Sequence, residues 1–266
     1  LRGSEELVNS NPDNKKKNPM YQRIWTMVYS FLMFILVRNA VQYALLALLY
    51  QLAQSGASGG LVDLLILRDE TGAYNGYSGD VSSIIAALGF IGGALAVWST
   101  AKLLITKNKE DMHLSHLKKE GKAKYALLVA VTIGAVIGFN LLFELLGVTN
   151  KSEAYTEVAA QQYSAHFIVG ILVFGFISPI AEELLFRGVI YGYLRRFMDI
   201  KLAIALSALI FGVYHMNYVQ GIYGFLIGCL MAYAYEYFGE FKMAVFVHVA
   251  SNVLAYCLSY TACLLY

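Results

Sequence analysis

Residues 167–194 decide the fold of this chain; they read FIVGILVFGFISPIAEELLFRGVIYGYL. The run is long enough to cross a bilayer, since about 20 consecutive apolar residues suffice. It nevertheless carries three full charges close together, at Glu182, Glu183 and Arg187. A charged group in the middle of a bilayer costs about 2.5–3.5 kcal/mol even on a mild insertion scale. Such a cluster therefore indicates a functional site within a membrane helix.

The composition of the whole chain agrees with a membrane protein. Of its 266 residues, 58% are hydrophobic and 14% are charged, against about 45–50% and about 25% in soluble proteins. This composition excludes a compact soluble enzyme, whose surface needs more charge, and a disordered chain, which needs low hydrophobicity. The net charge of +2 suggests no nucleic-acid partner.

Seven apolar segments have spanning length or come close to it. Because lipid offers no hydrogen bonds to an exposed backbone, we expect each of them to be helical. The predicted fold class is all-α, a polytopic transmembrane bundle of about seven to eight helices. The fourth segment has room for one kinked helix or for a helix followed by a short second one. The segments lie at 24–53, 81–105, 125–147, 166–197, 201–217, 221–237 and 242–263.

Lys and Arg residues alternate between the loops and predict the orientation. The first 23 residues hold five of them, loop 54–80 one, loop 106–124 six and loop 148–165 one. Basic loops favour the cytoplasmic side. We therefore expect a multi-pass protein of the cell membrane, with its N-terminus and loop 106–124 in the cytoplasm and loop 54–80 outside. The chain starts with Leu rather than Met, so we expect part of its basic N-terminal segment to derive from cloning.

Helical geometry separates the charges of the fourth segment. Glu183 and Arg187 are four residues apart, on one face and in the favourable order for an ion pair. Glu182 lies about 100° around the helix from Glu183 and is left without that partner, which makes it a candidate general base. Two other charges within spans, Arg38 and Lys102, can be explained by long side chains that reach the interface or by their place in a span.

Two histidines in later segments are candidates to meet Glu182. Glu182 and His215 are equally distant from the polar turn between their segments, so a regular antiparallel hairpin places them at the same depth. His248 and Asn252 share a helical face. Their depth, counted from the turn before their segment, differs from that of Glu182 and His215 by about 5–11 Å at about 1.5 Å per residue. Pro179, one turn before the carboxylates, is expected to kink the helix and to free a carbonyl.

Three short motifs on these segments resemble, in the same order, those of the CPBP intramembrane proteases. This family comprises the type II CAAX prenyl endopeptidases and proteins of bacteriocin processing or immunity. The resemblance covers about residues 166–255, and the earlier segments carry no matching motif. The motifs are Glu182-Glu183-x-x-x-Arg187, Phe211-x-x-x-His215 and His248-x-x-x-Asn252.

The resemblance implies a glutamic-type endopeptidase that hydrolyses a peptide bond in a membrane-associated peptide or protein. Carried over by position, Glu182 would activate a water molecule with help from His215. Hydrogen bonds to the tetrahedral oxyanion would come from His248 and Asn252. The supporting residues would be Glu183, Arg187 and Phe211.

The domain organisation follows from the same comparison. We expect a basic cytoplasmic segment at 1–23, N-terminal transmembrane helices at 24–165 and a CPBP-like catalytic core at 166–266. We expect no cofactor and no metal. One Glu and two His could bind zinc, but the helical H-E-x-x-H arrangement is missing, and the resemblance implies chemistry that needs no metal.

Three other interpretations remain open from the sequence. A non-catalytic immunity or scaffold protein could sequester a bacteriocin or a signal peptide. A proton-coupled transporter also uses intramembrane Glu, Arg and His residues, although no inverted repeat is visible. A buried ion-pair network that only fixes helix register is disfavoured, because desolvating so many groups rarely stabilises a protein. The sequence indicates neither whether the substrate is prenylated nor the oligomeric state.

Overall fold

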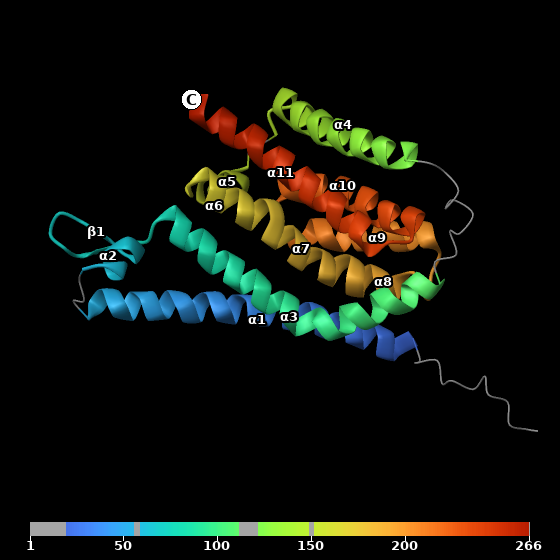
Figure 1. The fold of residues 1–266 in the computed structure, drawn as a ribbon, viewed down its shortest axis with the longest axis horizontal. Coiled ribbons are helices and arrows are strands. Elements are labelled where there is room, and N and C mark those ends of the chain that lie inside the picture. The colour runs from blue at the N-terminus through green and yellow to red at the C-terminus, as the bar shows by residue number, and fades with distance from the viewer. Residues whose placement is uncertain (1–19, 56–58, 112–121, 149–151, 266) are drawn as a thin grey trace, which may run out of the picture.

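The structure, a computed structural model, describes residues 20–55, 59–111, 122–148 and 152–265. It is an α-helical bundle, as the sequence predicts (Figure 1). Within the described residues, six helices are long and apolar enough to cross a membrane, and the apolar helix α9 is shorter. The chain is a multi-pass membrane protein.

The elements follow one another along the chain with these bounds. They are α1 (Met20–Gln54), α2 (Leu61–Leu65), β1 (Leu67–Arg68), β2 (Tyr74–Gly76), α3 (Gly79–Asp111), α4 (Ala123–Leu145), α5 (Glu153–Tyr163), α6 (Phe167–Gly170), the π-helical η3 (Ile171–Ile177), α7 (Ser178–Glu183), the π-helical η4 (Leu184–Tyr191), α8 (Gly192–Leu194), α9 (Ile200–Tyr214), α10 (Tyr218–Phe238) and α11 (Phe241–Leu265).

The two N-terminal helices, α1 and α3, pack side by side, and a small hairpin lies beyond one end of the pair (Figure 1). In this hairpin β1 pairs with β2 in antiparallel orientation. The Asp69 carboxylate accepts hydrogen bonds from the backbone N–H groups of Thr71 and Ala73 and stabilises the turn. Residues 59–80 therefore contain defined secondary structure, which the Gly-rich sequence of loop 54–80 did not predict.

The segment that contains the carboxylates is one unbroken helical run, from α6 through η3, α7 and η4 to α8. This settles the alternative between one helix and two in favour of one. Its hydrogen-bond pattern widens in η3, where the N–H of Ser178 bonds to the carbonyl of Val173, five residues earlier. Such π-helical stretches occur in α-helices most often at functional sites.

Helix-capping residues define the short connections between the last helices of the bundle. The Asp199 carboxylate accepts from the N–H of Lys201 and begins α9, and the Asn217 side chain does the same for α10. Gly239 ends α10 in the left-handed conformation, with φ of 66°, as glycine does without steric cost. Because Asn217 caps α10, α9 already ends at Tyr214, and the predicted segment 201–217 was too long.

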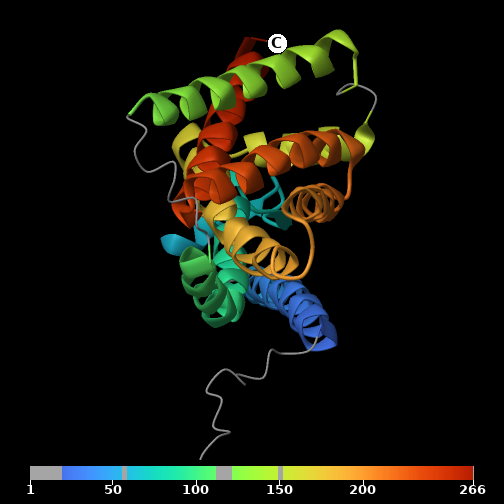
Figure 2. The same cartoon turned by 90° about the vertical axis from the view of Figure 1, so that its right-hand side faces the viewer.

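Helix α4 packs against α11, on the side of the molecule opposite α1 (Figures 1 and 2). Before the central helical run, residues 153–163 form α5, where the sequence predicted only a loop. The Ser152 hydroxyl caps α5 by accepting from the N–H of Tyr155.

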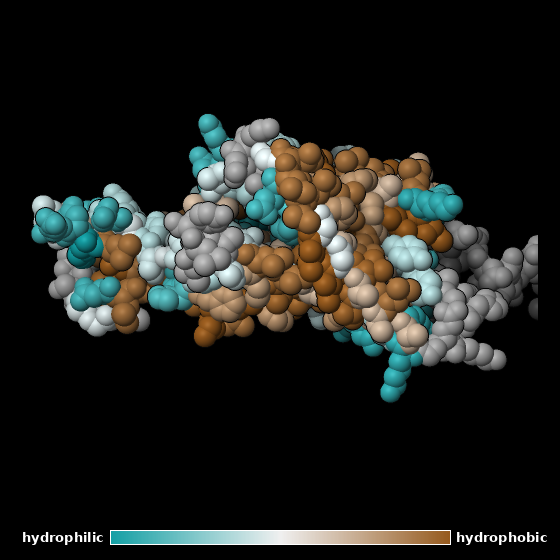
Figure 3. All heavy atoms as spheres, turned by 90° about the horizontal axis from the view of Figure 1, so that it is seen from above, coloured by the Kyte–Doolittle hydropathy of each residue, from teal (hydrophilic) through white to brown (hydrophobic). Residues whose placement is uncertain are grey.

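On the face that carries α4, hydrophobic surface occupies the middle of the molecule and hydrophilic residues gather toward its ends (Figure 3). This distribution suits a bilayer, where exposed apolar side chains face lipid. Residues 1–19 and 112–121, which hold most of the basic N-terminal segment and of loop 106–124, lie outside the described residues. The cytoplasmic position of the N-terminus therefore stays a prediction.

Candidate active site

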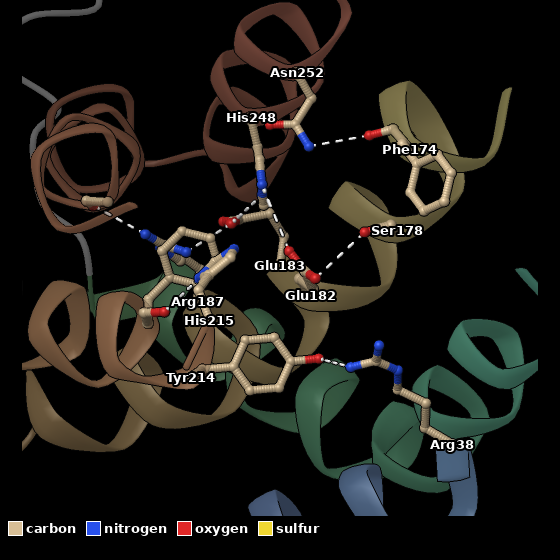
Figure 4. Close-up of polar contacts among 12 residues, drawn as sticks. Arg38, Phe174, Ser178, Glu182, Glu183, Arg187, Tyr214, His215, His248 and Asn252 are labelled. Carbon is tan, nitrogen blue, oxygen red and sulfur yellow. Dashed lines mark hydrogen bonds and ion pairs between the residues drawn. The ribbon is translucent and has the colours of Figure 1, made fainter. Parts of the chain in front are cut away.

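Pro179 shapes the helix that carries the acidic residues. In the π-helical pattern before it, the Ser178 N–H bonds to the Val173 carbonyl, five residues earlier, so the same spacing would make Phe174 the partner of residue 179. Proline has no N–H to donate. The side-chain amide of Asn252 donates to the Phe174 carbonyl instead, at 3.0 Å (Figure 4). The freed carbonyl that the sequence predicted at this proline is thus bonded by another helix, α11.

Glu183 and Arg187 form the ion pair that their spacing predicts. The Arg187 Nη1 atom lies 2.7 Å from Glu183 Oε1, and both side chains are fully buried. Arg187 also donates to the Gly228 carbonyl at 3.0 Å and stacks over the Phe211 ring at 4.7 Å. The pair therefore ties η4 to α9 and α10. Two of its buried atoms, Glu183 Oε2 and Arg187 Nε, form no hydrogen bond with the described residues.

His248 connects the two glutamates. Its Nδ1 lies 2.9 Å from Glu183 Oε1, and its Nε2 lies 3.7 Å from Glu182 Oε2. Glu183 pairs with Arg187 and is therefore a carboxylate that only accepts, so we assign the ring proton to Nδ1. The depth mismatch of about 5–11 Å expected for regular hairpins is absent, because α11 is anchored on α7 and η3 through these contacts.

Glu182 is almost fully buried, with 6% of its side chain exposed. Ser178 donates to its Oε1 atom at 3.3 Å from the preceding turn. Among the described residues it has no Lys or Arg at ion-pair distance, in contrast to its neighbour Glu183. The helical geometry thus separates the two acids as the sequence predicts.

His215 lies in the turn after α9, outside the helix where the sequence placed it. The next residue, Met216, has a φ of 58°, which turns the backbone away from the helix. The Nδ1 atom of His215 is 2.9 Å from the Phe211 carbonyl. A carbonyl only accepts, so Nδ1 is the donor and Nε2 carries the lone pair.

A cavity of about 560 Å³ brings the four predicted catalytic side chains together. Its wall comes both from the central and C-terminal helices and from α1, α3, α4 and α5, which the sequence motifs do not cover. The four side chains are Glu182, His215, His248 and Asn252. Phe211, predicted as a supporting residue, also lines the cavity, while Glu183 and Arg187 lie behind its wall.

Sequence reasoning missed Arg38 as a part of this site. The side chain does not reach for the interface, because Nη1 donates to the Tyr214 hydroxyl and the guanidinium lies 4.1 Å from the Phe90 ring centroid. It lines the same cavity as Glu182. The signal that could have found it is the one that singled out Glu182, a charge in an apolar span.

The side chains of the site can also be judged as possible metal ligands. Within the described residues, no group of three or more His, Cys, Asp and Glu side chains is arranged as metal ligands. Both histidines of the site engage their Nδ1 atoms with protein groups. The absence of a metal cofactor stays a prediction.

Comparison with known proteins adds a family to this geometry. Residues 164–254 match the family model of the Rce1-like type II CAAX prenyl endopeptidases. No curated protein and no solved structure matches the chain. The matched residues agree with the region of about 166–255 in which the three motifs lie. Residues 164–254 of this chain are therefore similar to the Rce1-like endopeptidases, in agreement with the resemblance to the CPBP intramembrane proteases.

Proposed function

We propose that this cavity is the active site of an intramembrane endopeptidase in which Glu182, helped by His215, activates a water molecule. The family match supports intramembrane endopeptidase activity in general. One observation carries the finer proposal: Glu182, which has no Lys or Arg at ion-pair distance among the described residues, lines one cavity together with two histidines and an amide. These are the groups that acyl transfer to water requires.

The contacts of the two acids favour Glu182 as the base. Glu183 Oε1 is bonded by both Arg187 and His248 and Glu183 does not line the cavity, whereas the Glu182 carboxylate faces it. The His215 ring presents its unprotonated Nε2, since Nδ1 is engaged with the Phe211 carbonyl. A water between Glu182 and His215 would therefore meet two acceptors, which orients it for attack.

The reaction that we propose adds one water across a peptide bond. The water oxygen attacks the carbonyl carbon while one proton passes to Glu182. The carbonyl oxygen becomes an oxyanion. Glu182 then gives its proton to the nitrogen of the leaving amine as the carbon–nitrogen bond breaks, and a carboxyl and an amine product remain.

Asn252 and His248 are the proposed donors to the oxyanion. One N–H of the Asn252 amide bonds to the Phe174 carbonyl and fixes the group, which leaves the second N–H for the substrate. The Nε2 atom of His248 can donate only when the ring is protonated, because Nδ1 already holds the proton of the neutral form. Each such donor typically contributes about 3–4 kcal/mol to catalysis.

The proposed substrate is a membrane-associated peptide or protein. The cavity volume lies within the range of about 300–1,000 Å³ that is usual for small-ligand sites. Aromatic and aliphatic side chains from several membrane helices alternate in its wall with polar groups.

The test is an unbiased comparison of membrane peptides from cells that produce the wild-type protein or Glu182→Ala. We expect peptide products that depend on Glu182 and on His215, since loss of a general base typically lowers a rate about 10²–10⁴-fold. Glu144→Ala is the matched control, because Glu144 is an exposed acid of α4. Each variant is checked for its folded helical content in detergent.

Two results would count against the proposal. Undiminished product formation by folded Glu182→Ala would show that this carboxylate does no chemistry. Full protection of cells from a bacteriocin by Glu182→Ala, without any change in membrane peptides, would favour a sequestering protein instead.

A further inference from the structure

Several helix ends meet at the end of the bundle that carries the hairpin. Helix α3 begins at Gly79, directly after the hairpin. The start of α6 lies beside it, because Asp80 Oδ1 accepts from the backbone N–H of His166 at 2.7 Å. The last turns of α11 are also here, since the Tyr260 ring packs against Phe167 with centroids 5.1 Å apart. Figure 1 shows the hairpin, α5, α6 and the C-terminal end of α11 toward the left. We call this end of the bundle the hairpin side.

The cavity extends from Glu182 toward the hairpin side. Its lining residues on α3 lie within 82–90, and those on α4 lie within 140–143. Helix α3 begins and α4 ends on the hairpin side (Figure 1). In the central helical run, no described residue after Glu182 lines the cavity. Glu182 therefore lies at the inner end of the cavity, and the space opens away from it in one direction.

Buried side chains close the bundle in the opposite direction. All eight residues of η4, which follows the two glutamates along the helix, are buried. The Phe186 ring packs edge-on against Phe211 and Tyr214, with ring centroids 4.9 and 5.2 Å apart. A peptide that approached Glu182 from this direction would have to displace these packed groups.

Helix α5 lies between the hairpin-side end of the cavity and water. Four of its residues recur at intervals of three and four, so they share one helical face, and all four line the cavity. They are Tyr155, Val158, Ala159 and Gln162. The opposite face is exposed and carries Glu153 and Glu157. Because charged side chains are costly inside lipid, this outer face belongs to the aqueous phase.

Helix α5 is held loosely, although the segment after it is firmly anchored. None of its eleven residues, all of which the structure describes, is buried. After it, a Cβ added at Gly79 would lie 2.3 Å from the Ser164 backbone, and His166 bonds to Asp80. Elements that bury little apolar surface open at a low free energy without unfolding the rest of a protein. Helix α5 can therefore lift from the cavity about the anchored segment 164–166.

We propose that the substrate enters the cavity from the hairpin side, past α5 as a movable cover, and is a peptide that is exposed on that side of the membrane. The inference rests on the proposed function for the reaction, but access to the cavity does not require turnover. Loop 106–124, which its Lys and Arg residues predict to be cytoplasmic, follows the opposite end of α3. The hairpin side is then the outside, and the substrate class is secreted or membrane-anchored peptides rather than cytoplasmic C-termini.

The test labels single cysteines with a thiol reagent that does not cross membranes, a methanethiosulfonate with a quaternary ammonium group. The full chain is used after its native cysteines have been replaced with alanine. The cavity is probed by Ala86→Cys on α3 and, independently, by Ala255→Cys on α11, since both residues line it. The native cysteines are Cys229, Cys257 and Cys263.

Two marker variants report which side of the membrane the reagent reaches. Glu70→Cys lies in the exposed turn of the hairpin, and Lys109→Cys lies near the opposite end of α3. Right-side-out and inside-out vesicles are labelled in parallel. We expect both cavity positions to react from the side that labels Glu70→Cys and not from the side that labels Lys109→Cys. The matched control is Leu88→Cys, which is exposed on α3 without lining the cavity and should not react, because a charged reagent does not dissolve in lipid.

A second pair of variants tests α5 as the cover. Ala160 lies on the exposed face of α5 and does not line the cavity. We expect Ala160→Pro to raise the labelling rate of Ala86→Cys at least about tenfold, because a proline inside a helix removes a hydrogen bond and clashes with the preceding turn. Ala160→Ser keeps the helix and should leave the rate unchanged.

Three results would overturn the proposal. The entry route is wrong if neither cavity position reacts from the hairpin side, or if both react equally from the two sides. The role of α5 is wrong if Ala160→Pro labels at the rate of Ala160→Ser. Glu182→Gln, by contrast, should keep the labelling pattern without cleavage. Cleavage by Glu182→Gln would refute the proposed function and leave the entry route standing.

Discussion

Replacing Arg187 with methionine removes the cation that pairs with Glu183 while keeping a side chain of similar length. Both partners are fully buried, and their closest atoms are 2.7 Å apart. With charge centres about 4 Å apart and an effective dielectric constant of about 20, their attraction is about 4 kcal/mol. Removing one member of a buried pair typically costs about 3–5 kcal/mol, because the other charge is left without compensation.

The local contacts place the expected loss at the lower end of that range. His248 Nδ1 lies 2.9 Å from the same Glu183 oxygen and remains as a donor after Arg187 is gone. The Gly228 carbonyl loses one hydrogen bond, which contributes about 1 kcal/mol. We therefore expect Arg187→Met to lower the free energy of unfolding by about 3–4 kcal/mol.

The double variant Arg187→Met/Glu183→Leu separates the charge from the packing. With both charges replaced by apolar side chains, neither member of the pair is left as an uncompensated buried charge, and such replacements are often neutral or stabilising. We expect the double variant to be more stable than either single variant. The assay is reversible unfolding in mixed micelles of a mild detergent and dodecyl sulfate, followed by circular dichroism, with Lys102→Met as the control at an exposed position. A double variant less stable than Arg187→Met alone would refute this reasoning.

Two further predictions concern helix contacts. Asn252→Leu leaves the Phe174 carbonyl without its donor and should lower the free energy of unfolding by about 1–3 kcal/mol. Adding Pro179→Ala restores a backbone N–H and should recover part of this loss. Additive losses of the two substitutions in the same unfolding assay would contradict the pairing. Gly212→Ala would place a methyl carbon 2.5 Å from a backbone oxygen of α10 and should lower the free energy of unfolding by about 1–3 kcal/mol. Gly134→Ala, where the added methyl group meets no other atom, should be neutral or slightly stabilising. Equal thermal unfolding midpoints of the two variants would refute this prediction.

Local spacing in the sequence predicted part of the site correctly. The interval of four between Glu183 and Arg187 was sufficient to predict their ion pair, because an α-helix or a slightly widened one brings both residues to the same face. The same rule separated Glu182 from them. The helical bundle itself followed from the length and apolar character of the segments, since a bilayer leaves few alternatives to helices.

Relations between helices were harder to predict. The position of His248 was expected to disagree with that of Glu182 by about 5–11 Å, because the estimate assumed straight helices starting at equal depths. Instead, the two side chains are 3.7 Å apart. The sequence gives the position of Pro179. It predicts neither the π-helical stretches on either side of this residue nor the partner of the carbonyl that the proline frees. Arg38 was explained as a snorkelling residue because nothing in α1 alone indicates a tyrosine acceptor on α9.

The cavity wall has a consequence for how proteins with this domain can diversify. The side chains proposed to do chemistry all lie between residues 164 and 254, whereas α1, α3, α4 and α5 close much of the enclosure from outside that range. Without those helices, the acidic residues of the matched segment would therefore be exposed to the acyl chains of the lipids. Exchanging these N-terminal helices for others would keep the reacting groups and change which substrates the cavity admits. Different stretches of the chain therefore determine the reaction type and the substrate selectivity.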